Sequence, residues 1–325
     1  MSLTLASADQ LTHDLIFAGI VEETVEEDPL LSLLPFETVT GFKQVAYNRE
    51  NNLGAESQYI GIDDTIDEST PTWTQVTETL KILADRMEID RFLAETKNAV
   101  QNIEAAALAG KGKQMMRKFH DKFYYGDQTS NANEINGLHS STILSSGQTI
   151  ENGSSATGAA GTLTELTQLV TTVKPGRPDV LFCNRNMLRR FSSPYISNVQ
   201  YNVNKDTIGD LLSDFAGIPL AITDYITMTE AISGGSFSTR TGGATTTMFA
   251  VKFGRGSRVV PGTNGVFNVD GVLGIQAGPM NVGMPQELVN KLGHSRKLWW
   301  YHDVIIGSTL SIAAYTGLTD AAFTI

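Results

Sequence analysis

The chain has few of the residues that mark disulfide-linked, membrane-spanning or secreted proteins. Its only cysteine is Cys183, so an intramolecular disulfide is excluded and a reducing cytoplasm is the compartment that we expect. No stretch reaches the ~20 consecutive apolar residues that a membrane-spanning helix needs. The N-terminus has no positive patch followed by an apolar core, so we expect no secretory signal and no membrane partner.

Residue patterns that carry catalysis or bind metals are also missing. There is no Gly-x-Ser-x-Gly nucleophile elbow, and AGKGKQ at 109–114 lacks the Ser or Thr that must follow Gly-Lys in a phosphate loop. A zinc pair of His294 and His302 is disfavoured, because no histidine has a partner at metal-ligand spacing. The five histidines are His13, His120, His139, His294 and His302. Cys183 lies in an apolar run typical of an unreactive thiol. We therefore predict no catalytic, cofactor-binding or metal-binding residues and no cofactor.

Positive charge is scarce as well. The formal net charge is −11, and residues 1–100 carry 19 Asp and Glu against 6 Lys and Arg. The affinity of a protein for DNA comes largely from Lys and Arg side chains that displace counterions from phosphates. If this protein works beside nucleic acid, its composition indicates that it encloses the nucleic acid rather than gripping it.

The chain does have the size and composition of a folded protein. It has 325 residues, of which 41% are hydrophobic and 18% charged. This is the composition of a globular protein, and the length is sufficient for two domains with a substantial core. No internal repeat of 20–50 residues is visible, so a solenoid is not expected.

Residues 97–124 predict one long helix. Apolar side chains recur at helical spacing along one face; they are Ala105, Leu108, Met116, Phe119 and Phe123. A helix of about 27 residues would be about 40 Å long, more than an ordinary compact domain needs. The sequence YYGDQ at 124–128 and an Asn-rich loop then end it. Such a helix is typical of a strut in a building element.

Residues 8–34 predict an amphipathic helix with an acidic side, ended by Pro29. Its acidic residues are Glu22, Glu23, Glu26, Glu27 and Asp28. One interpretation is a surface helix with solvated charges. The other is an arm that packs on a neighbouring subunit, for which Leu15 and Val21 are candidate interface residues.

Between these helices the sequence indicates a long two-stranded arm. Residues 38–47 and 73–92 alternate in hydropathy, although Glu78 falls on the apolar side. With ~15 residues per strand the arm would reach ~50 Å. Residues 48–72 lack periodicity, which favours a binding loop and leaves a surface insertion as the alternative. Candidate interface residues are its acids: Glu50, Glu56, Asp63, Asp64, Asp67 and Glu68.

The second half of the chain predicts an α/β unit followed by apolar strands. Residues 145–161 are rich in Gly, Ser and Ala and indicate a linker or a domain boundary. A short helix over 163–173 precedes a buried strand at 179–183, and Asn184 is a predicted helix cap. We expect a helix at 211–215 before a strand, a mobile loop at 233–247, strands at 248–254 and 265–274, and two apolar strands within 297–315.

The order of these elements resembles one known family. The phrases that carry the resemblance are Glu27-Asp-Pro-Leu-Leu-Ser-Leu-Leu-Pro-Phe36, Tyr125-Gly-Asp-Gln-Thr, Asp179-Val-Leu-Phe-Cys-Asn184, Gly217-Ile-Pro-Leu and Phe249-Ala-Val-Lys-Phe-Gly254. Their order and spacing, over nearly the whole chain, resemble the major capsid proteins of tailed bacteriophages, which have the Hong Kong 97 fold.

The resemblance implies an α+β fold with the domains of that family. They would be an N-terminal arm at 1–36, a peripheral domain from 37–45 and 77–160 around the spine helix at 97–124, an extended loop at 46–76, and an axial domain at 161–255. Residues 256–325 would hold the strands that return to the peripheral domain and the C-terminus. Copies of the chain would form pentamers and hexamers of an icosahedral head in the virion, around double-stranded DNA that is bound without sequence specificity.

The resemblance also implies partners and leaves alternatives. A scaffold protein and a portal protein are expected, a decoration protein stays open, and assembly would take place in the host cytoplasm. The chain has no long N-terminal scaffolding segment, which favours a separate scaffold, and its loop has no lysine, which argues against self-crosslinking. An encapsulin-type compartment is the first alternative. An α/β enzyme is the second, disfavoured because no site residues converge.

Overall fold

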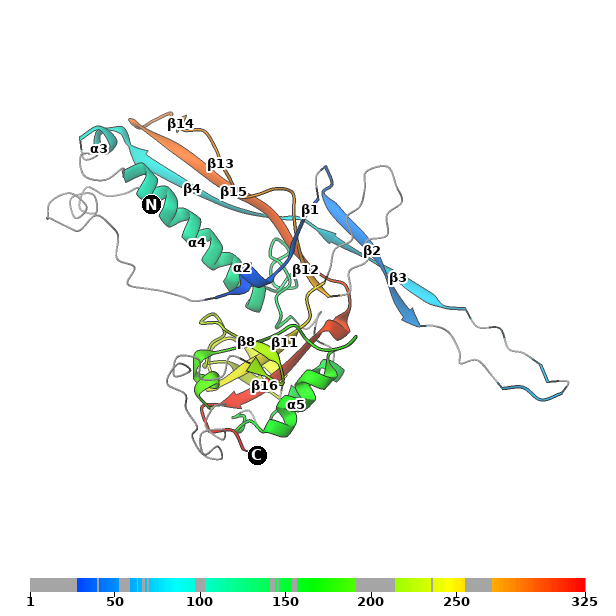
Figure 1. Ribbon diagram of the computed structural model, residues 1–325. Helices are drawn as coiled ribbons and strands as arrows, with labels where there is room; N and C mark the ends of the chain where they lie inside the picture. Colours follow the sequence, from blue (N-terminus) through cyan, green and yellow to red (C-terminus); the bar gives the residue numbers. More distant parts are fainter. Residues whose placement is uncertain are drawn as a thin grey trace.

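Two six-stranded sheets and a projecting hairpin organise the chain (Figure 1). The computed structural model describes residues 28–39, 41–52, 59–62, 64–65, 68, 70–96, 103–140, 144, 146–153, 157–190, 214–234, 236–254 and 271–324. Within these residues, no helix is both long and apolar enough to cross a membrane.

The first sheet is built on β15 (Gly293–Ile306), the longest strand. On one side β15 pairs along its length with antiparallel β4 (Lys81–Asp90). On the other side it pairs with β12 (Val272–Gln276), β13 (Asn281–Val282) and β14 (Gln286–Glu287), and β1 (Phe36–Thr38) runs parallel to β12. The apolar run that predicted a strand within 297–315 therefore forms the centre of the sheet.

Helix α4 (Ile103–Tyr125) lies along this sheet, as Figure 1 shows. It ends where the sequence predicted, while residues 97–102 are outside the described part of the chain. Phe119 and Phe123 are buried as expected, but Met115 rather than Met116 is buried with them, and Ala105 is exposed. Met115, Phe119 and Phe123 recur every four positions, so they share one side of the helix.

The turn after α4 depends on a close approach of two glycine backbones. The N–H of Gly137 donates to the carbonyl oxygen of Gly126 at 2.8 Å. A Cβ atom on Gly126 would lie 2.3 Å from the carbonyl oxygen of Ile135 and 2.4 Å from that of Lys122. Any larger residue at 126 would have to displace backbone, so this position requires glycine.

The second sheet has the order β5 (Thr149–Glu151), β16 (Ile312–Thr319), β11 (Thr245–Val251), β6 (Val180–Cys183), β8 (Ile218–Ile222) and β7 (Asp214–Phe215). Helix α5 (Leu163–Thr172) packs against it, and the hydroxyl of Thr162 accepts the N–H of Glu165 as its N-cap. The short helix at 163–173 and the buried strand at 179–183 are confirmed. Asn184 is a cap as predicted, because its side-chain oxygen accepts the N–H of Asn186 at 2.9 Å.

Three expectations about this half are wrong. The linker at 145–161 contains β5, in which Ile150 is buried against β16. The expected mobile loop at 233–247 contains β10 (Ser236–Thr239), which pairs with β9 (Ala231–Ser233), and the buried start of β11. Residues 214–215 are a strand rather than the end of a helix. In the stretches 145–161 and 233–247, tertiary pairing overrides a polar or small-residue composition.

The predictions for the N-terminal segment are only partly covered by the described residues. The predicted helix at 8–34 lies outside the described residues as far as 27, and a single helical turn, α2 (Leu30–Leu33), follows Pro29. The strand predicted at 38–47 is two elements, β1 and β2 (Gln44–Asn52). Leu30 and Leu34 are both buried, so the apolar run after Pro29 is a core contact.

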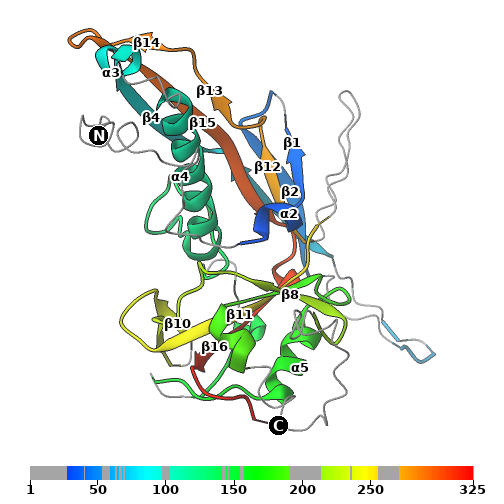
Figure 2. The same cartoon turned by 60° about the vertical axis from the view of Figure 1, so that its left-hand side comes forward.

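The arm exists but is shorter than expected. Strand β2 pairs with antiparallel β3 (Thr72–Thr79), and the hairpin projects from the body of the molecule in Figures 1 and 2. Strands of 9 and 8 residues span about 26–30 Å rather than ~50 Å. The segment predicted as one strand over 73–92 is divided at Leu80, because β3 pairs with β2 whereas β4 pairs with β15. Ile82 is consequently exposed, and helix α3 (Arg91–Thr96) begins directly after β4.

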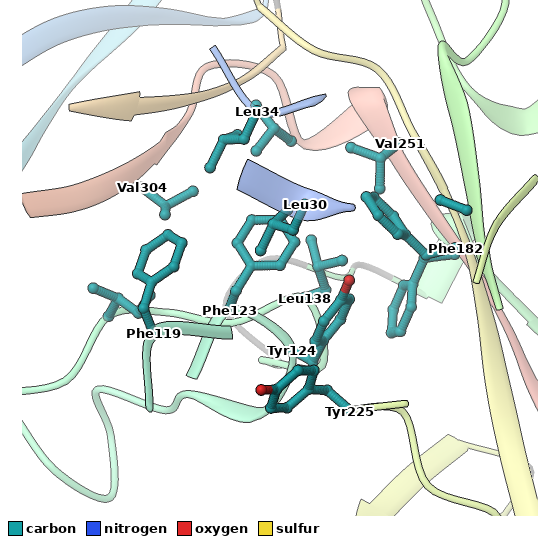
Figure 3. Close-up of a cluster of buried hydrophobic side chains, with 14 of the residues drawn as sticks. Leu30, Leu34, Phe119, Phe123, Tyr124, Leu138, Phe182, Tyr225, Val251 and Val304 are labelled. Carbon is teal, nitrogen blue, oxygen red and sulfur yellow. The ribbon is translucent and has the colours of Figure 1, made fainter. Parts of the chain in front are cut away.

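One aromatic core is shared by both sheets (Figure 3). Phe119 of α4 packs edge-on against Trp300 of β15, with ring centroids 5.1 Å apart. One turn later, Phe123 packs edge-on against Phe182 of β6, with ring centroids 6.3 Å apart. Tyr124 packs against the same ring, with centroids 5.8 Å apart. The C-terminal half of α4 therefore fills the space between the two sheets.

A smaller core lies where the arm meets the first sheet. Val45 and Tyr47 of β2 pack on Leu273, Ile275 and Ile305. Asp303 of β15 is also buried here, at 1% exposure. Burial raises the pKa of Asp303 from 3.8 to about 7, and the charge of Glu78 adds to that rise. The pKa of Glu78 is raised too, again mainly by burial. Glu78 thus lies on the apolar side of β3, as the sequence pattern indicated.

We predict that Phe119→Ala destabilises the unassembled subunit by about 3–5 kcal/mol, the usual cost of removing a buried phenylalanine ring. Lys118→Ala is the matched control, because Lys118 is exposed on the same helix one residue away. Urea unfolding followed by circular dichroism measures both. Equal effects of the two changes would mean that the buried face of α4 is assigned wrongly.

We predict that Asp303→Asn changes the pH dependence of stability. Because the pKa of Asp303 is raised from 3.8 to about 7, the native state holds a proton that the unfolded chain has lost between these values. The free energy of unfolding therefore falls as pH rises through this window. Asp303→Asn should therefore raise the free energy of unfolding by roughly 1–3 kcal/mol at pH 8 and change it little at pH 4. Chemical unfolding at both pH values, with Glu50→Gln as the exposed control, measures this. A pH-independent difference from wild type would contradict it.

Candidate assembly surfaces

The residues most capable of chemistry are buried and unreactive. Burial raises the pKa of the Cys183 thiol to about 12 and lowers that of His302 from 6.5 to about 4. His302 stacks on Trp300 with ring centroids 4.2 Å apart. His294 lies eight residues earlier on the same strand, about 26 Å away at the usual rise, so the two cannot share a metal. Among the described residues, no group of three or more His, Cys, Asp or Glu side chains could hold a metal ion.

A cleft of about 640 Å³ lies between β4, α4 and the connections that follow β8 and β10. Charges of both signs line it, and they are Asp85, Arg117, Lys118, Asp121, Asp224 and Arg240. Several are already paired: Arg240 with Asp121, and Asp85 with Lys111 at 3.1 Å. The lining residues include no Ser, Cys or His that could act as a nucleophile or base. The cleft is therefore a boundary between neighbouring elements that ion pairs hold together.

The arm presents large apolar side chains to solvent. Near its tip Tyr59 and Ile62 are fully exposed, at 107% and 98%, and Trp73 on β3 is 63% exposed. The carboxylate of Asp64 accepts the N–H of Gly61 at 2.6 Å, which closes a local turn between them. Clustered exposed apolar side chains mark interaction surfaces. The arm is therefore a candidate contact with another molecule.

The acidic interface candidates are only partly described. Glu50 lies on β2 opposite Trp73, and it is exposed, as are Asp64 and Glu68 nearer the tip. These three acids lie along the arm and not in one cluster. Glu56, Asp63, Asp67, Leu15 and Val21 are outside the described residues. The role of all eight as interface residues stays a prediction.

A second exposed apolar surface lies at the end of the first sheet farthest from the arm, in Figure 1 near α3 and β14. Its residues are Phe92, Val282, Met284, Val289 and Leu292, between 44% and 98% exposed. Sequence reasoning missed this surface. A signal was present for Met284, Val289 and Leu292, because these three lie in Pro- and Gly-containing connections where no core packing is expected.

The base of the arm is held to the first sheet by backbone acceptors, which the sequence analysis also missed. The hydroxyl of Tyr47 donates to the carbonyl oxygen of Ile306 at 2.9 Å. The guanidinium of Arg49 donates to the carbonyl oxygens of Ile306 at 2.8 Å and Gly307 at 3.1 Å. Arg49 is the only base in the acidic loop, and that isolation was the available signal. These bonds fix the direction in which the arm leaves the body.

A buried polar cluster joins the end of α4 to the second sheet. The carboxylate of Glu230 accepts the hydroxyls of Tyr125 at 2.5 Å and Thr247 at 2.6 Å. His139 Nε2 lies 3.1 Å from the same carboxylate, and its Nδ1 donates to the carbonyl oxygen of Tyr124 at 3.0 Å. Burial and the charge of Glu230 raise the pKa of Tyr125, so its hydroxyl stays a donor. Fully buried polar groups in such a network have one low-energy arrangement.

Comparison with solved structures shows the same fold in proteins that form shells. An encapsulin complex of Synechococcus elongatus matches with a TM-score of 0.65 at 13% identity, over 100% of this chain and 99% of that one. The capsid of a GTA particle matches with 0.65 at 10% identity, over 97% and 98%. The capsid of the Myoviridae phage XM1 matches with 0.60 at 13% identity, over 96% and 98%. The α+β fold is therefore of the Hong Kong 97 type.

Comparison with protein families is more specific. No curated protein sequence matches the chain. The family model for the SU10 major capsid protein, however, matches residues 12–227, which is well over half of the sequence and includes the arm, α4 and the first strands of the second sheet. Since both the family model and the fold point to the same role, the chain belongs to the SU10 family of phage major capsid proteins.

Proposed function

We propose that this capsid protein forms the pentamers and hexamers of an icosahedral phage head around double-stranded DNA. The observation that carries the proposal is the arm, which is fixed to the body by Tyr47 and Arg49 and has exposed Tyr59 and Ile62 near its tip. A rigid projection with an apolar end fits a socket on a neighbouring copy. The excess of acidic residues fits a wall that does not hold DNA tightly.

The proposal includes the partners and the place of assembly that the family resemblance implies. A scaffold protein would direct curvature and a portal protein would occupy one vertex. Assembly would take place in the host cytoplasm before DNA enters. The exposed surface around Phe92 and Leu292 gives each subunit a second apolar contact, at the end of the sheet opposite the arm.

An encapsulin-type compartment is the second candidate, because the Synechococcus encapsulin has the same fold over the full length of both chains. The two functions differ in what the shell encloses. Negative-stain microscopy of purified particles before and after nuclease, together with electrophoresis of their contents, separates them. DNA-filled particles support the phage head, and particles filled only with a protein cargo overturn it.

We predict that the tip of the arm is needed for assembly and not for folding. Residues 53–71 should be replaced with Asn-Gly, which closes a two-residue hairpin between the paired residues Asn52 and Thr72. The subunit should unfold at the wild-type urea midpoint but form no shells in microscopy. The control variant Thr65→Ser keeps the tip and should assemble. Normal shells from the shortened arm would refute this role.

We also predict that the shell is held without covalent crosslinks. Residues 46–76 contain no lysine, and arginine stays protonated and is not a nucleophile. Lys81 is occupied at the base of the arm, where its amine donates to the carbonyl oxygen of Ala132 at 2.7 Å. Particles boiled in detergent should therefore give one band at 35.2 kDa. A ladder of multimers that survives boiling and reductant would show that another residue pair forms a bond.

A further inference from the structure

The arm is joined to the body by one apolar contact and two short connections. Val45 and Tyr47 of β2 pack on the apolar face that β12 and β15 present. Leu80 alone separates β3 from β4, and residues 39–43 join β1 to β2. Connections as short as these act as hinges when the packing beside them opens. We use the name arm seat for the packed residues Val45, Tyr47, Leu273, Ile275 and Ile305.

A carboxyl group with an unpaired oxygen lies in the arm seat. Asp303 of β15 is aligned with Ile275 and lies two residues from Ile305, so the three side chains share one face of the sheet. Asp303 is 1% exposed, and its Oδ1 accepts the N–H of Val304 at 2.8 Å. Its Oδ2 is buried and has no hydrogen-bond partner among the described residues. An ionised carboxylate in this place loses its hydration without replacement, so Asp303 is better accommodated with a proton.

Other acids at the arm seat increase the cost of a negative charge there. Burial raises the pKa of Asp303 from 3.8 to about 7, and the charge of Glu78 on β3 contributes to the rise. Burial also raises the pKa of Glu78 itself. Glu37 of β1 is aligned with Ile275 and half-buried, so it adds a further acid on this face of the sheet. A charge on Asp303 is therefore repelled by the arm as well as poorly hydrated.

The bases at the arm seat are bonded to backbone oxygens instead of to Asp303. The guanidinium of Arg49 donates to two carbonyl oxygens at the end of β15, and the amine of Lys81 donates to that of Ala132 at 2.7 Å. The charge of Lys81 lowers the pKa of Asp303, but by less than burial raises it. Burial raises the pKa of Tyr47, so its hydroxyl stays neutral. Among the described side chains, none therefore replaces a proton on Asp303.

We propose that Asp303 is a pH-dependent switch of the arm: with its proton the arm seat stays closed, and loss of that proton lets the arm part from the first sheet more often. Parting moves Glu78 away and admits water to Asp303, so the charge is hydrated in the open state. Tyr47 and Arg49 keep the closed state in the majority, and the switch acts on the small open fraction. The proposal concerns the single subunit and does not depend on what a shell encloses.

The direction of the effect follows from the state that holds the proton. In the closed seat Asp303 keeps its proton up to about pH 7, whereas in the open state the hydrated group releases it to solvent near the ordinary pKa of 3.8. Between these values opening releases a proton, so the open fraction rises with pH, by at most about tenfold per pH unit for one proton. Above about pH 7 the group is ionised in both states, and the open fraction levels off.

Thiol labelling of the Val45→Cys variant, as the unassembled subunit, measures how often the arm seat opens. Val45 is 8% exposed, so a thiol of similar size at this position reacts mainly when the arm parts, and the native Cys183, 1% exposed in the second sheet, is the control in the same chain. Labelling with dithiodipyridine from about pH 4.5 to 7.5, with each rate divided by that of the same thiol in urea, should rise at least about tenfold at position 45. Cys183 should react more slowly at every pH. Equal labelling of the two thiols would mean that only the whole subunit opens, and would overturn the proposal.

Matched variants in the Val45→Cys chain identify the group that holds the proton. Asp303→Asn keeps the shape of the side chain but cannot ionise, so labelling at position 45 should lose most of its pH dependence. Glu50→Gln removes an exposed carboxyl of the same arm and should leave the rise intact. Glu78→Gln should move the rise to lower pH, because it removes one cause of the raised pKa of Asp303. A full rise that persists in Asp303→Asn, or one that stays in place in Glu78→Gln, would show that another group controls the arm.

Discussion

The burial of the C-terminal half of α4 between the two sheets is the constraint on which the rest of the structure depends. Phe119 packs on Trp300 of the first sheet, and Phe123 and Tyr124 pack on Phe182 of the second. Because adjacent turns of one helix serve both sheets, neither sheet can rotate without separating aromatic rings that are almost completely buried. The two sheets therefore keep a fixed relation, which a subunit that must fit many identical neighbours requires.

Polar contacts fix the orientation of the elements that pack around this apolar core. Ring contacts alone tolerate small rotations, whereas Glu230 must keep Tyr125 and Thr247 as donors, because a buried carboxylate without partners is costly. Arg49 has the same effect at the base of the arm through the carbonyl oxygens of Ile306 and Gly307. In both places a charged side chain binds groups whose positions a strand or helix end has already fixed, so the orientation follows from the secondary structure.

The sequence was informative where one local pattern decides the structure. The end of α4, the helix at 163–173 and the buried strand at 179–183 follow from periodicity, glycine and capping residues that act within a few positions. It was misleading where a distant partner decides. Ile150 lies in a Gly/Ser-rich stretch and becomes a strand only because β16 is beside it. Likewise Leu80 separates two strands because β4 pairs with β15, whereas β3 pairs with β2. The exposure of Met284 and Leu292 depends on the whole fold, which no window of residues contains.

The same division between fixed and exposed parts explains how such a subunit belongs in a shell, where many copies assemble. At the base of the arm, Tyr47 and Arg49 have their hydrogen-bond acceptors within the subunit, so assembly adds no stabilising contact there. Near the tip, Tyr59 and Ile62 are left in water, and burying a side chain of this size contributes about 1.5–3 kcal/mol. One such contact is weak. Each subunit of a closed shell makes several at once, and because they are linked through one rigid body, the later contacts form at high effective concentration. Rigidity inside the subunit therefore converts modest apolar contacts into a stable wall.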